Sequence, residues 1–215
     1  MSDTFWWKCG GCGVVLHTED EKRDHKCPMD KYPKYESAMW GHGNYVFSED
    51  SVIDLHPTAI LYENIKFRPG IKLSMKENTF IGDGVKILVP MLIMMKGSQI
   101  NAGTVISGRK AVMLSKNAVV GYNCVISSSS DTPRGKYMND ASPEDKRVIK
   151  QGPILLRENC FVSSLSFIGP DVTIGERTVV GLHTSVVHSL PSDTIYAVDK
   201  NVNISKNRTE WQNEQ

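Results

Sequence analysis

The hydrophobic residues of the long carboxyl-terminal part of the chain recur every six positions. This spacing matches neither the period of an α-helix nor the alternation of an ordinary strand. The series tolerates short slips and one long interruption, and its eighteen positions are Leu55, Leu61, Phe67, Leu73, Ile81, Ile87, Ile93, Ile100, Ile106, Leu114, Val120, Ile126, Leu156, Val162, Ile168, Ile174, Val180 and Val186. A six-residue period is typical of a parallel β-helix, in which short strands are joined by tight turns and the same position of every rung points inward.

A glycine often follows the hydrophobic residue of the repeat. The pairs are Ile81-Gly82, Val120-Gly121, Ile168-Gly169, Ile174-Gly175 and Val180-Gly181. A heptad or an amphipathic helix would not produce this pattern. The sequence therefore predicts a mainly β protein built from short, stacked strands.

One segment breaks the period and cannot be a rung. It comprises 26 residues, mostly polar and with Pro and Gly among them, from Ser127 to Gly152. A long loop inside a compact domain is usually either functional or disordered. Both alternatives are open from the sequence.

Composition and charge exclude several classes of protein. The 215 residues carry 25 Lys and Arg against 24 Asp and Glu, which gives a net charge of +1 and argues against a nucleic-acid binder. Hydrophobic residues at 40% and charged residues at 23% are ordinary for one globular domain with a small appendage. The longest apolar run, residues 87–95, contains a Pro and is too short to span a membrane. The amino terminus lacks the features of a signal peptide, so we expect a cytoplasmic protein.

The first 27 residues hold a candidate metal site. Cys9 and Cys12 have the C-x2-C spacing that lets two thiolates bind one ion. His25 follows after twelve intervening residues, and Cys27 stands two positions further on. We predict that these four side chains bind a structural Zn2+, with His17 as a rival for the fourth position. The alternative is a free CxxC in a tail of the chain.

These observations divide the chain into four parts. We expect a zinc-knuckle module over residues 1–28, a linker over 29–50, a β-helix over 51–205 and a tail over 206–215. The interruption, residues 127–153, is then a loop inserted into the β-helix.

The segment from Ile168 to Gly181, IGPDVTIGERTVVG, resembles the hexapeptide-repeat acyltransferases, whose motif is an aliphatic residue, a Gly and four more residues. The resemblance covers residues 51–205. The long loop that returns through Gly152-Pro153 is similar to the sugar O-acetyltransferase branch. The resemblance implies a left-handed parallel β-helix with a triangular cross-section and three repeats per coil. Eighteen positions then correspond to about six coils.

The resemblance also implies an activity. Members of this family form homotrimers, bind acetyl-CoA in the groove between adjacent prisms, and transfer the acetyl group to a hydroxyl or amine of a small acceptor such as a sugar or nucleotide-sugar. Carried over position by position, the CoA contacts are Ser164, Leu182 and His188, with Phe161 at the place of a Trp. The family's terminal Gly-Asn-Pro-Ala-Lys segment is replaced here by the unrelated residues 198–202, VDKNV.

The resemblance departs at the catalytic base. Family members use a His at the start of the loop, whereas an ungapped alignment puts Asp131 there, and it puts Asn101 on the active-site Asn. Asp has an ordinary pKa of about 3.9 and is a weak base unless its surroundings raise that value. Three explanations compete: Asp131 is the base, another His has replaced it, with His183 and His188 as the candidates, or the protein is a noncatalytic trimeric scaffold or binding protein.

Overall fold

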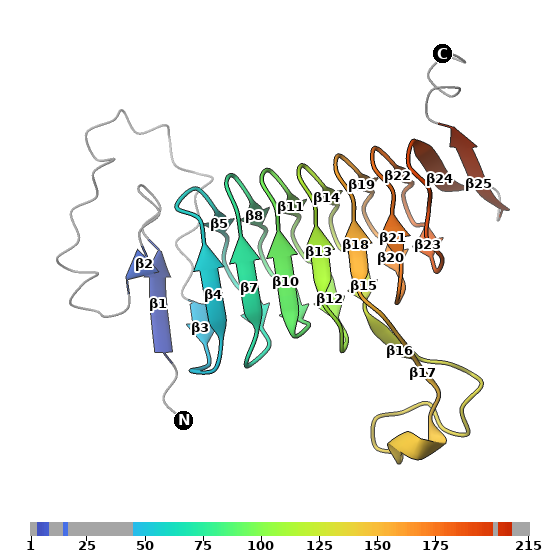
Figure 1. Cartoon of the computed structure of the whole chain (residues 1–215), viewed down its shortest axis with the longest axis horizontal. Helices are drawn as coiled ribbons and strands as arrows, with labels where there is room; N and C mark the ends of the chain where they lie inside the picture. Colours follow the sequence, from blue (N-terminus) through green and yellow to red (C-terminus); the bar gives the residue numbers. More distant parts are fainter. Residues whose placement is uncertain (1–3, 9–14, 17–44, 200–201, 208–215) are drawn as a thin grey trace.

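The computed structural model describes residues 4–8, 15–16, 45–199 and 202–207, and its main body is a parallel β-solenoid (Figure 1). The first sheet contains β4 (Val52–Leu55), β7 (Lys72–Met75), β10 (Met91–Met94), β13 (Val112–Leu114), β18 (Ile154–Leu156) and β21 (Thr173–Ile174). The second contains β5 (Ile60–Leu61), β8 (Phe80–Ile81), β11 (Gln99–Ile100), β14 (Val119–Val120), β19 (Phe161–Val162), β22 (Val179–Val180), β24 (Thr194–Asp199) and β25 (Val202–Asn207). The third contains β6 (Lys66–Phe67), β9 (Lys86–Leu88), β12 (Val105–Ser107), β15 (Val125–Ser127), β20 (Phe167–Ile168) and β23 (Ser185–Val186).

The prediction of a mainly β, parallel coil is confirmed, but the expected number of coils was slightly too small. Six complete turns are present, because the first and third sheets each hold six strands. A further turn begins where Leu190 forms a bridge with Ile174 and β24 pairs in parallel with β22. The solenoid thus has about seven turns. The sequence did not predict the last one, because this part has no long aliphatic series that the six-residue period could detect.

Antiparallel pairing is found near the two ends of the solenoid. At the amino-terminal side, β1 (Thr4–Lys8) pairs with both β2 (Val15–Leu16) and β3 (Tyr45–Phe47). At the carboxyl-terminal side, β25 pairs with β24 along six residues. No helix of the described residues is long and apolar enough to cross a membrane.

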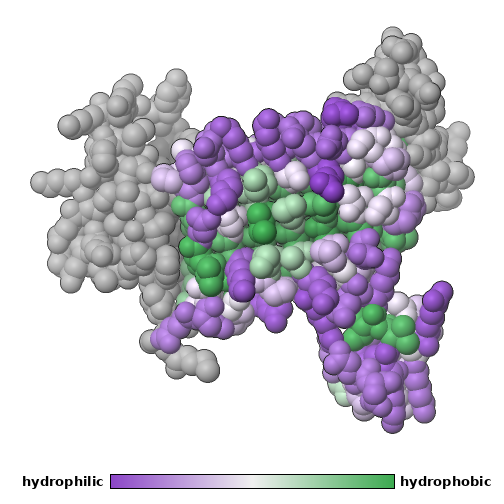
Figure 2. Space-filling view, in the orientation of Figure 1, coloured by the Kyte–Doolittle hydropathy of each residue, from purple (hydrophilic) through white to green (hydrophobic). Residues whose placement is uncertain are grey.

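The side chains of each strand alternate between the inside and the outside of the solenoid. In β10, Leu92 and Met94 are fully buried whereas Ile93 is only partly buried. Ile93 therefore points outward, where it lies beside Met113 on β13. Met113 in turn lies beside Leu155 on β18. The outer face of the first sheet, which faces the viewer in Figure 2, accordingly carries a hydrophobic band between polar margins.

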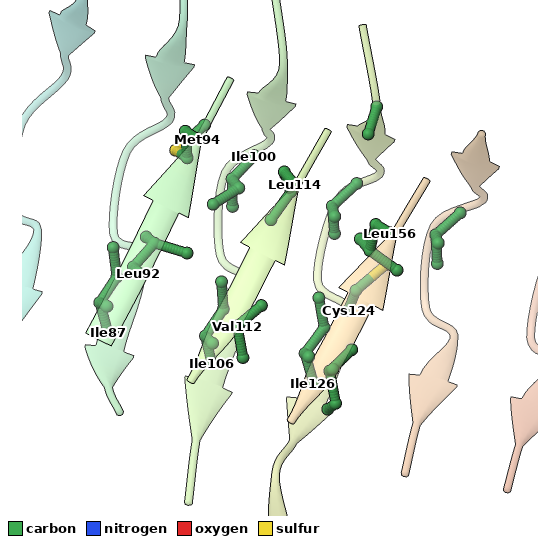
Figure 3. Close-up of a cluster of buried hydrophobic side chains, with 14 of the residues drawn as sticks. Ile87, Leu92, Met94, Ile100, Ile106, Val112, Leu114, Cys124, Ile126 and Leu156 are labelled. Carbon is green, nitrogen blue, oxygen red and sulfur yellow. The ribbon is translucent and has the colours of Figure 1, made fainter. Parts of the chain in front are cut away.

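The inside of the solenoid is a continuous stack of aliphatic side chains (Figure 3). Fifteen of the eighteen positions of the six-residue series are buried. Leu55 and Phe67, on the first turn, are partly buried and pack against the core. The assignment of Ile93 to the core was wrong by one residue, since its neighbours Leu92 and Met94 occupy the inward positions. Burial of one such side chain contributes about 1.5–3 kcal/mol, so the stack is the main source of stability.

Close contact between successive turns explains the glycine that follows the aliphatic residue. A Cβ atom on Gly121 would lie 2.6 Å from the backbone nitrogen of Ser164 on the next turn. Gly169 differs, because its nearest neighbour would be a ring carbon of Phe167 at 3.4 Å. Steric crowding by the adjacent backbone therefore requires glycine at the first position but not at the second.

Candidate active site

A β-hairpin replaces the turn between β15 and β18 and projects from the solenoid (Figure 1). Its strands β16 (Ser129–Asp131) and β17 (Ile149–Gln151) pair antiparallel, with Asp131 opposite Ile149. Between them lies the 3-10 helix η2 (Glu144–Lys146). The long polar interruption therefore folds as an ordered hairpin, and Gly152-Pro153 returns the chain to the next rung.

The root of this hairpin is fixed to the turn that follows β12. Ser128 is fully buried, and its hydroxyl accepts a hydrogen bond from the backbone N–H of Lys110 at 3.0 Å. The backbone N–H of Gly152 donates to the carbonyl oxygen of Ser128 at 3.1 Å. These contacts hold the first residues of β16 close to Gly108 and Arg109.

A hollow of about 290 Å³ lies at this root. It is lined by Gly108, Arg109, Ser129, Ser130, Asp131, Asp140, Arg147 and Ile149. Its wall is mostly polar, with two arginines, two aspartates and two hydroxyls around one aliphatic side chain. Its size is near the lower end of typical small-molecule sites, which suits a small group rather than a whole cofactor.

Ion pairs dominate the electrostatics of the hollow. Arg147 donates from Nε to Oδ1 of Asp131 at 2.8 Å and from Nη2 to Oδ2 at 2.6 Å. The same Nη2 donates to Oδ1 of Asp140 at 2.7 Å. Arg109 forms an ion pair with Glu144 of η2. Arg109 thus connects the solenoid to Glu144 in the outer part of the hairpin. Arg147 connects the hairpin strand that ends at Asp131 to Asp140, which also belongs to the outer part.

The Asp131–Arg147 pair is shielded from solvent. The Arg147 side chain is 5% exposed and that of Asp131 is 19% exposed. Hydrogen bonds from Arg147 lower the pKa of Asp131 below its ordinary value, and the bonds to Asp131 and Asp140 raise the pKa of Arg147. A carboxylate that accepts two charge-assisted bonds is a poor proton acceptor. In this arrangement Asp131 orients Arg147. The alignment suggests Asp131 as the general base, but its ion pair makes that role chemically unfavourable.

The other two residues predicted to be catalytic lie elsewhere. Asn101 and His183 both belong to the turns between the second and third sheets. The Asn101 amide donates to the carbonyl oxygen of Val120 at 2.7 Å, and His183 is exposed with a φ of 56°. They are three turns apart, which corresponds to about 14 Å at the usual strand spacing. Within one chain, neither of them lines the hollow that contains Asp131.

Three of the four predicted CoA contacts gather along that same edge. Ser164 and Leu182 occupy successive turns between the second and third sheets, and Phe161 belongs to the strand that enters this edge. Phe161 is 41% exposed and Leu182 is 57% exposed. His188 follows β23, the last strand of the third sheet. Its ring packs edge-on against that of Tyr196, with the ring centroids 5.6 Å apart. The structure therefore groups Ser164, Leu182 and Phe161 and leaves His188 separate.

The six-residue period did not reveal two features of the surface. Exposed apolar side chains of Tyr122 and Leu165 extend the edge formed by Leu182. Arg109 and Arg147 line the hollow, yet the sequence identified neither of them. Arg147 belongs to the interruption, where no repeat fixes its position.

The predicted zinc ligands cannot be placed. Cys9, Cys12, His25 and Cys27, together with the alternative ligand His17, lie outside the residues that the structure describes. In the described part of the chain, no group of three or more His, Cys, Asp and Glu side chains could hold a metal ion. Cys124 and Cys160, which are described, are buried and free. Burial raises the pKa of the Cys160 thiol to about 12, so neither a metal nor a nucleophilic role is indicated for it.

Sequence comparison links the chain to acetyltransferases. It is 28% identical over 133 residues to WcaF of Escherichia coli, which is assigned as a colanic acid biosynthesis acetyltransferase, and the same values hold for WcaF of Shigella flexneri. The alignment covers 62% of this chain and 61% of each WcaF. The chain thus spans about three fifths of the length of these relatives. No protein-family model matches the chain.

Solved structures agree on the architecture. A variant of AntD, an N-acyltransferase from Bacillus cereus, in complex with dTDP and coenzyme A, has a TM-score of 0.57 at 19% identity and covers 76% of this chain and 91% of AntD. AntD with dTDP and 3-hydroxybutyryl-CoA has a TM-score of 0.55 at 22% identity, with 76% and 88% covered. The chain shares its fold with AntD. At these identities the likeness concerns the fold alone.

Proposed function

We propose that the protein transfers an acyl group, acetyl in the simplest case, from acyl-CoA to a hydroxyl or amine of a sugar or nucleotide-sugar. The observation that carries this proposal is a parallel β-solenoid interrupted at one corner by a hairpin with a polar hollow at its root. The relatives support it, since WcaF is assigned as an acetyltransferase and AntD binds dTDP and CoA compounds. Such a reaction uses acyl-CoA, which supports the expected cytoplasmic location.

We further propose that the protein is a homotrimer. One apolar surface is the outer face of the first sheet, with Ile93, Met113 and Leu155. The other is the edge between the second and third sheets, where Leu165 is 48% and Leu182 is 57% exposed. In a three-sided solenoid this edge is opposite the first sheet. Two different apolar surfaces suit a heterologous contact, in which each copy presents one surface to the next, and a rotation of about 120° between copies would close the ring.

Acetyl-CoA would bind along the edge that carries Ser164, Leu182 and Phe161. The exposed apolar side chains of Phe161 and Leu182 suit the pantetheine arm, because they offer hydrophobic contact without displacing the backbone bonds of the solenoid. A neighbouring copy would form the other wall of the groove. His188, which is separate from this edge, would contact the donor only from another copy.

The catalytic assignments of Asp131, Asn101 and His183 stay predictions. If they act together, they must come from different copies, because one chain separates the hollow from the edge that carries Asn101 and His183. With Asp131 held by Arg147, His183 is the better candidate for the base, because its imidazole is exposed and carries a nitrogen lone pair that can accept a proton. An amine acceptor would ease this requirement, as amines deprotonate more readily than sugar hydroxyls.

A noncatalytic trimeric binding or scaffold protein is the second candidate. The Asp131–Arg147 pair favours it, because the ion pair stands where related enzymes are expected to place a catalytic His. Both candidates retain the solenoid and the hollow. They differ in whether acyl groups are transferred, so activity decides between them.

The amino-terminal zinc module is part of the proposal as a structural element. Its support is the spacing of Cys9, Cys12, His25 and Cys27 in the sequence. Elemental analysis of the purified protein tests it directly, and we expect about one zinc per chain. A protein free of zinc that folds and binds ligands normally would contradict it.

Calorimetric titration with CoA and acetyl-CoA, followed by an assay of thiol release, tests the proposed activity. The acceptor panel consists of nucleotide-sugars with a free amine and their hydroxyl counterparts. We expect micromolar CoA binding and acceptor-dependent release of CoA. Binding without turnover on any acceptor would favour the scaffold, and no heat at millimolar CoA would exclude the transferase.

A further inference from the structure

Two arginines reach the hollow from different parts of the chain. Arg109 follows β12 on the third turn of the solenoid, and Arg147 stands two residues before β17 in the hairpin. Each of them pairs with a carboxylate from the outer part of the hairpin, namely Glu144 for Arg109 and Asp140 for Arg147. The hairpin therefore places its own negative groups over both positive groups of the hollow.

The carboxylates differ in how firmly they are held. The side chains of Asp140 and Glu144 are 92% and 70% exposed, and the Arg109 side chain is 41% exposed. Ion pairs formed by carboxylates this exposed contribute little to stability, so a competing anion can displace Asp140 and Glu144. Asp131 is different, because it is mostly buried and makes two hydrogen bonds that fix the plane of the Arg147 guanidinium.

Arg147 keeps donor capacity for a ligand. Its Nε and Nη2 bind carboxylates, whereas its Nη1 makes no hydrogen bond with any other described residue. Arg147 lines the hollow, so a ligand bound there would lie close to this guanidinium group. Ser129 and Ser130 line the same hollow, and the Ser130 hydroxyl donates to the carbonyl oxygen of Asp131 at 3.1 Å.

The charge balance of the hollow changes when the outer carboxylates leave. With Asp140 and Glu144 in place, three carboxylates surround two guanidinium groups. Without them, Arg109 and Arg147 face Asp131 alone, and one positive charge is uncompensated. Guanidinium groups bind phosphate oxygens in a two-pronged geometry that matches their fork of N–H donors.

We propose that this hollow binds a phosphate or diphosphate ester of a substrate through Arg109 and Arg147, and that Asp140 and Glu144 form a latch which the phosphate displaces. This inference rests on the proposed function, because acyl-CoA and a nucleotide-sugar acceptor both carry a diphosphate ester. The phosphate comes from the acceptor or from CoA, and the chemistry of recognition is the same in both cases. Ligand binding and movement of the hairpin's outer part are then coupled.

Calorimetric titration of the full-length protein with dTDP and, separately, with CoA tests the proposal. Arg109→Ala is expected to weaken binding of the ligand that uses the hollow by about tenfold or more, since a charge-assisted contact is lost. Glu144→Gln is expected to strengthen binding of the same ligand roughly two- to fivefold, because it removes the competing charge. Arg134→Ala is the matched control: Arg134 is an exposed arginine of the same hairpin that does not line the hollow.

The two ligands distinguish the source of the phosphate. If Arg109→Ala weakens the binding of dTDP alone, the hollow is assigned to the acceptor. If it weakens the binding of CoA alone, the hollow is assigned to the donor. Either result supports the site. The inference is overturned if Arg109→Ala binds CoA normally and either binds dTDP equally normally or, like the unaltered protein, does not bind it. The proposed function then still stands. If neither ligand binds the unaltered protein, both fail. Arg109→Gln, of similar length, together with an unchanged melting temperature, shows that a loss is not due to misfolding.

The latch has its own criterion. If the carboxylates compete with the ligand, the effects of Glu144→Gln and Asp140→Asn have the same sign and both tighten binding. Weaker binding in either variant overturns the latch, since the carboxylate would then help the ligand. A steep decrease of affinity with added salt in the unaltered protein, reduced in Arg109→Ala, is expected for a phosphate contact.

Discussion

The guanidinium of Arg147 binds both carboxylate oxygens of Asp131, with Nε 2.8 Å from Oδ1 and Nη2 2.6 Å from Oδ2. The pair connects the two legs of the hairpin, since Asp131 ends β16 and Arg147 precedes β17. Around it, the backbone N–H of Thr132 donates to Val148 at 2.9 Å. A side chain placed at the expected site of a catalytic base therefore has a structural role in holding the hairpin closed.

The stability of the hairpin should depend on acid pH through Asp131. Because its pKa is lower in the folded hairpin than in an unfolded one, the pair stabilises the hairpin fully above the ordinary value of about 3.9. That contribution is lost as the pH falls below about 4 towards the lowered pKa. Hydrogen exchange of the Thr132 amide, expressed as a protection factor, should remain constant from pH 7 to pH 5 and decrease at lower pH.

Asp131→Asn is the control for this effect. The amide cannot titrate, so the variant should show weaker protection at pH 7 and a smaller change with pH. An unaltered pH dependence in Asp131→Asn would show that the pair does not hold the hairpin.

Catalysis should depend on His183 more than on Asp131 as a proton acceptor. His183→Gln is expected to lower kcat by about 100-fold or more, as for loss of a general base. Asp131→Asn should mainly raise KM, because it releases Arg147 and disturbs the hollow. Steady-state rates with the best acceptor, measured from pH 6 to pH 9, separate the two effects. A large loss of kcat in Asp131→Asn with KM unchanged would instead restore Asp131 as the base.

The register of β10 gives a direct stability test. Leu92 is fully buried, whereas its neighbour Ile93 lies on the outer face. Leu92→Ala should reduce the free energy of unfolding by about 2–5 kcal/mol. Ile93→Ala, in the adjacent position, should cost less than half as much. Urea denaturation of both variants measures this difference, and equal losses would place Ile93 either in the core or in the proposed contact between copies.

The sequence allowed prediction of the solenoid because its period repeats the same physical requirement in every rung. Each turn needs an aliphatic side chain inside, and errors such as Ile93 arise only where a turn gains a residue and the slip can be assigned to either of two neighbours. The hollow could not be predicted in this way. Asp131 and Arg147 are 16 residues apart in a segment without a repeat, and only the antiparallel pairing of β16 and β17 brings them together.

Glycine is required only where the next turn approaches closely. Gly121→Ala should destabilise the protein by about 1–3 kcal/mol, because the new Cβ would lie 2.6 Å from the backbone of Ser164. Gly169→Ala should be neutral or stabilise by up to about 1 kcal/mol, since it has room for a methyl group and restricts the unfolded chain. Thermal melting of the two variants distinguishes them. A similar loss in both would mean that the backbone conformation, rather than contact, imposes the glycine.

Assembly should depend on the edge that carries Leu182. This side chain is 57% exposed in the single chain, beside the exposed side chain of Leu165. Leu182→Asp would bury an unpaired charge in the proposed contact between copies, a change that costs far more than the loss of hydrophobic area alone. Light scattering coupled to gel filtration should therefore show a trimer for the unaltered protein and a monomer for the variant. Leu88→Asp, which places the same charge on an exposed leucine of the third sheet away from this edge, should remain trimeric. A trimer that persists in Leu182→Asp would exclude this edge from the interface, and with it the proposed position of acetyl-CoA between copies.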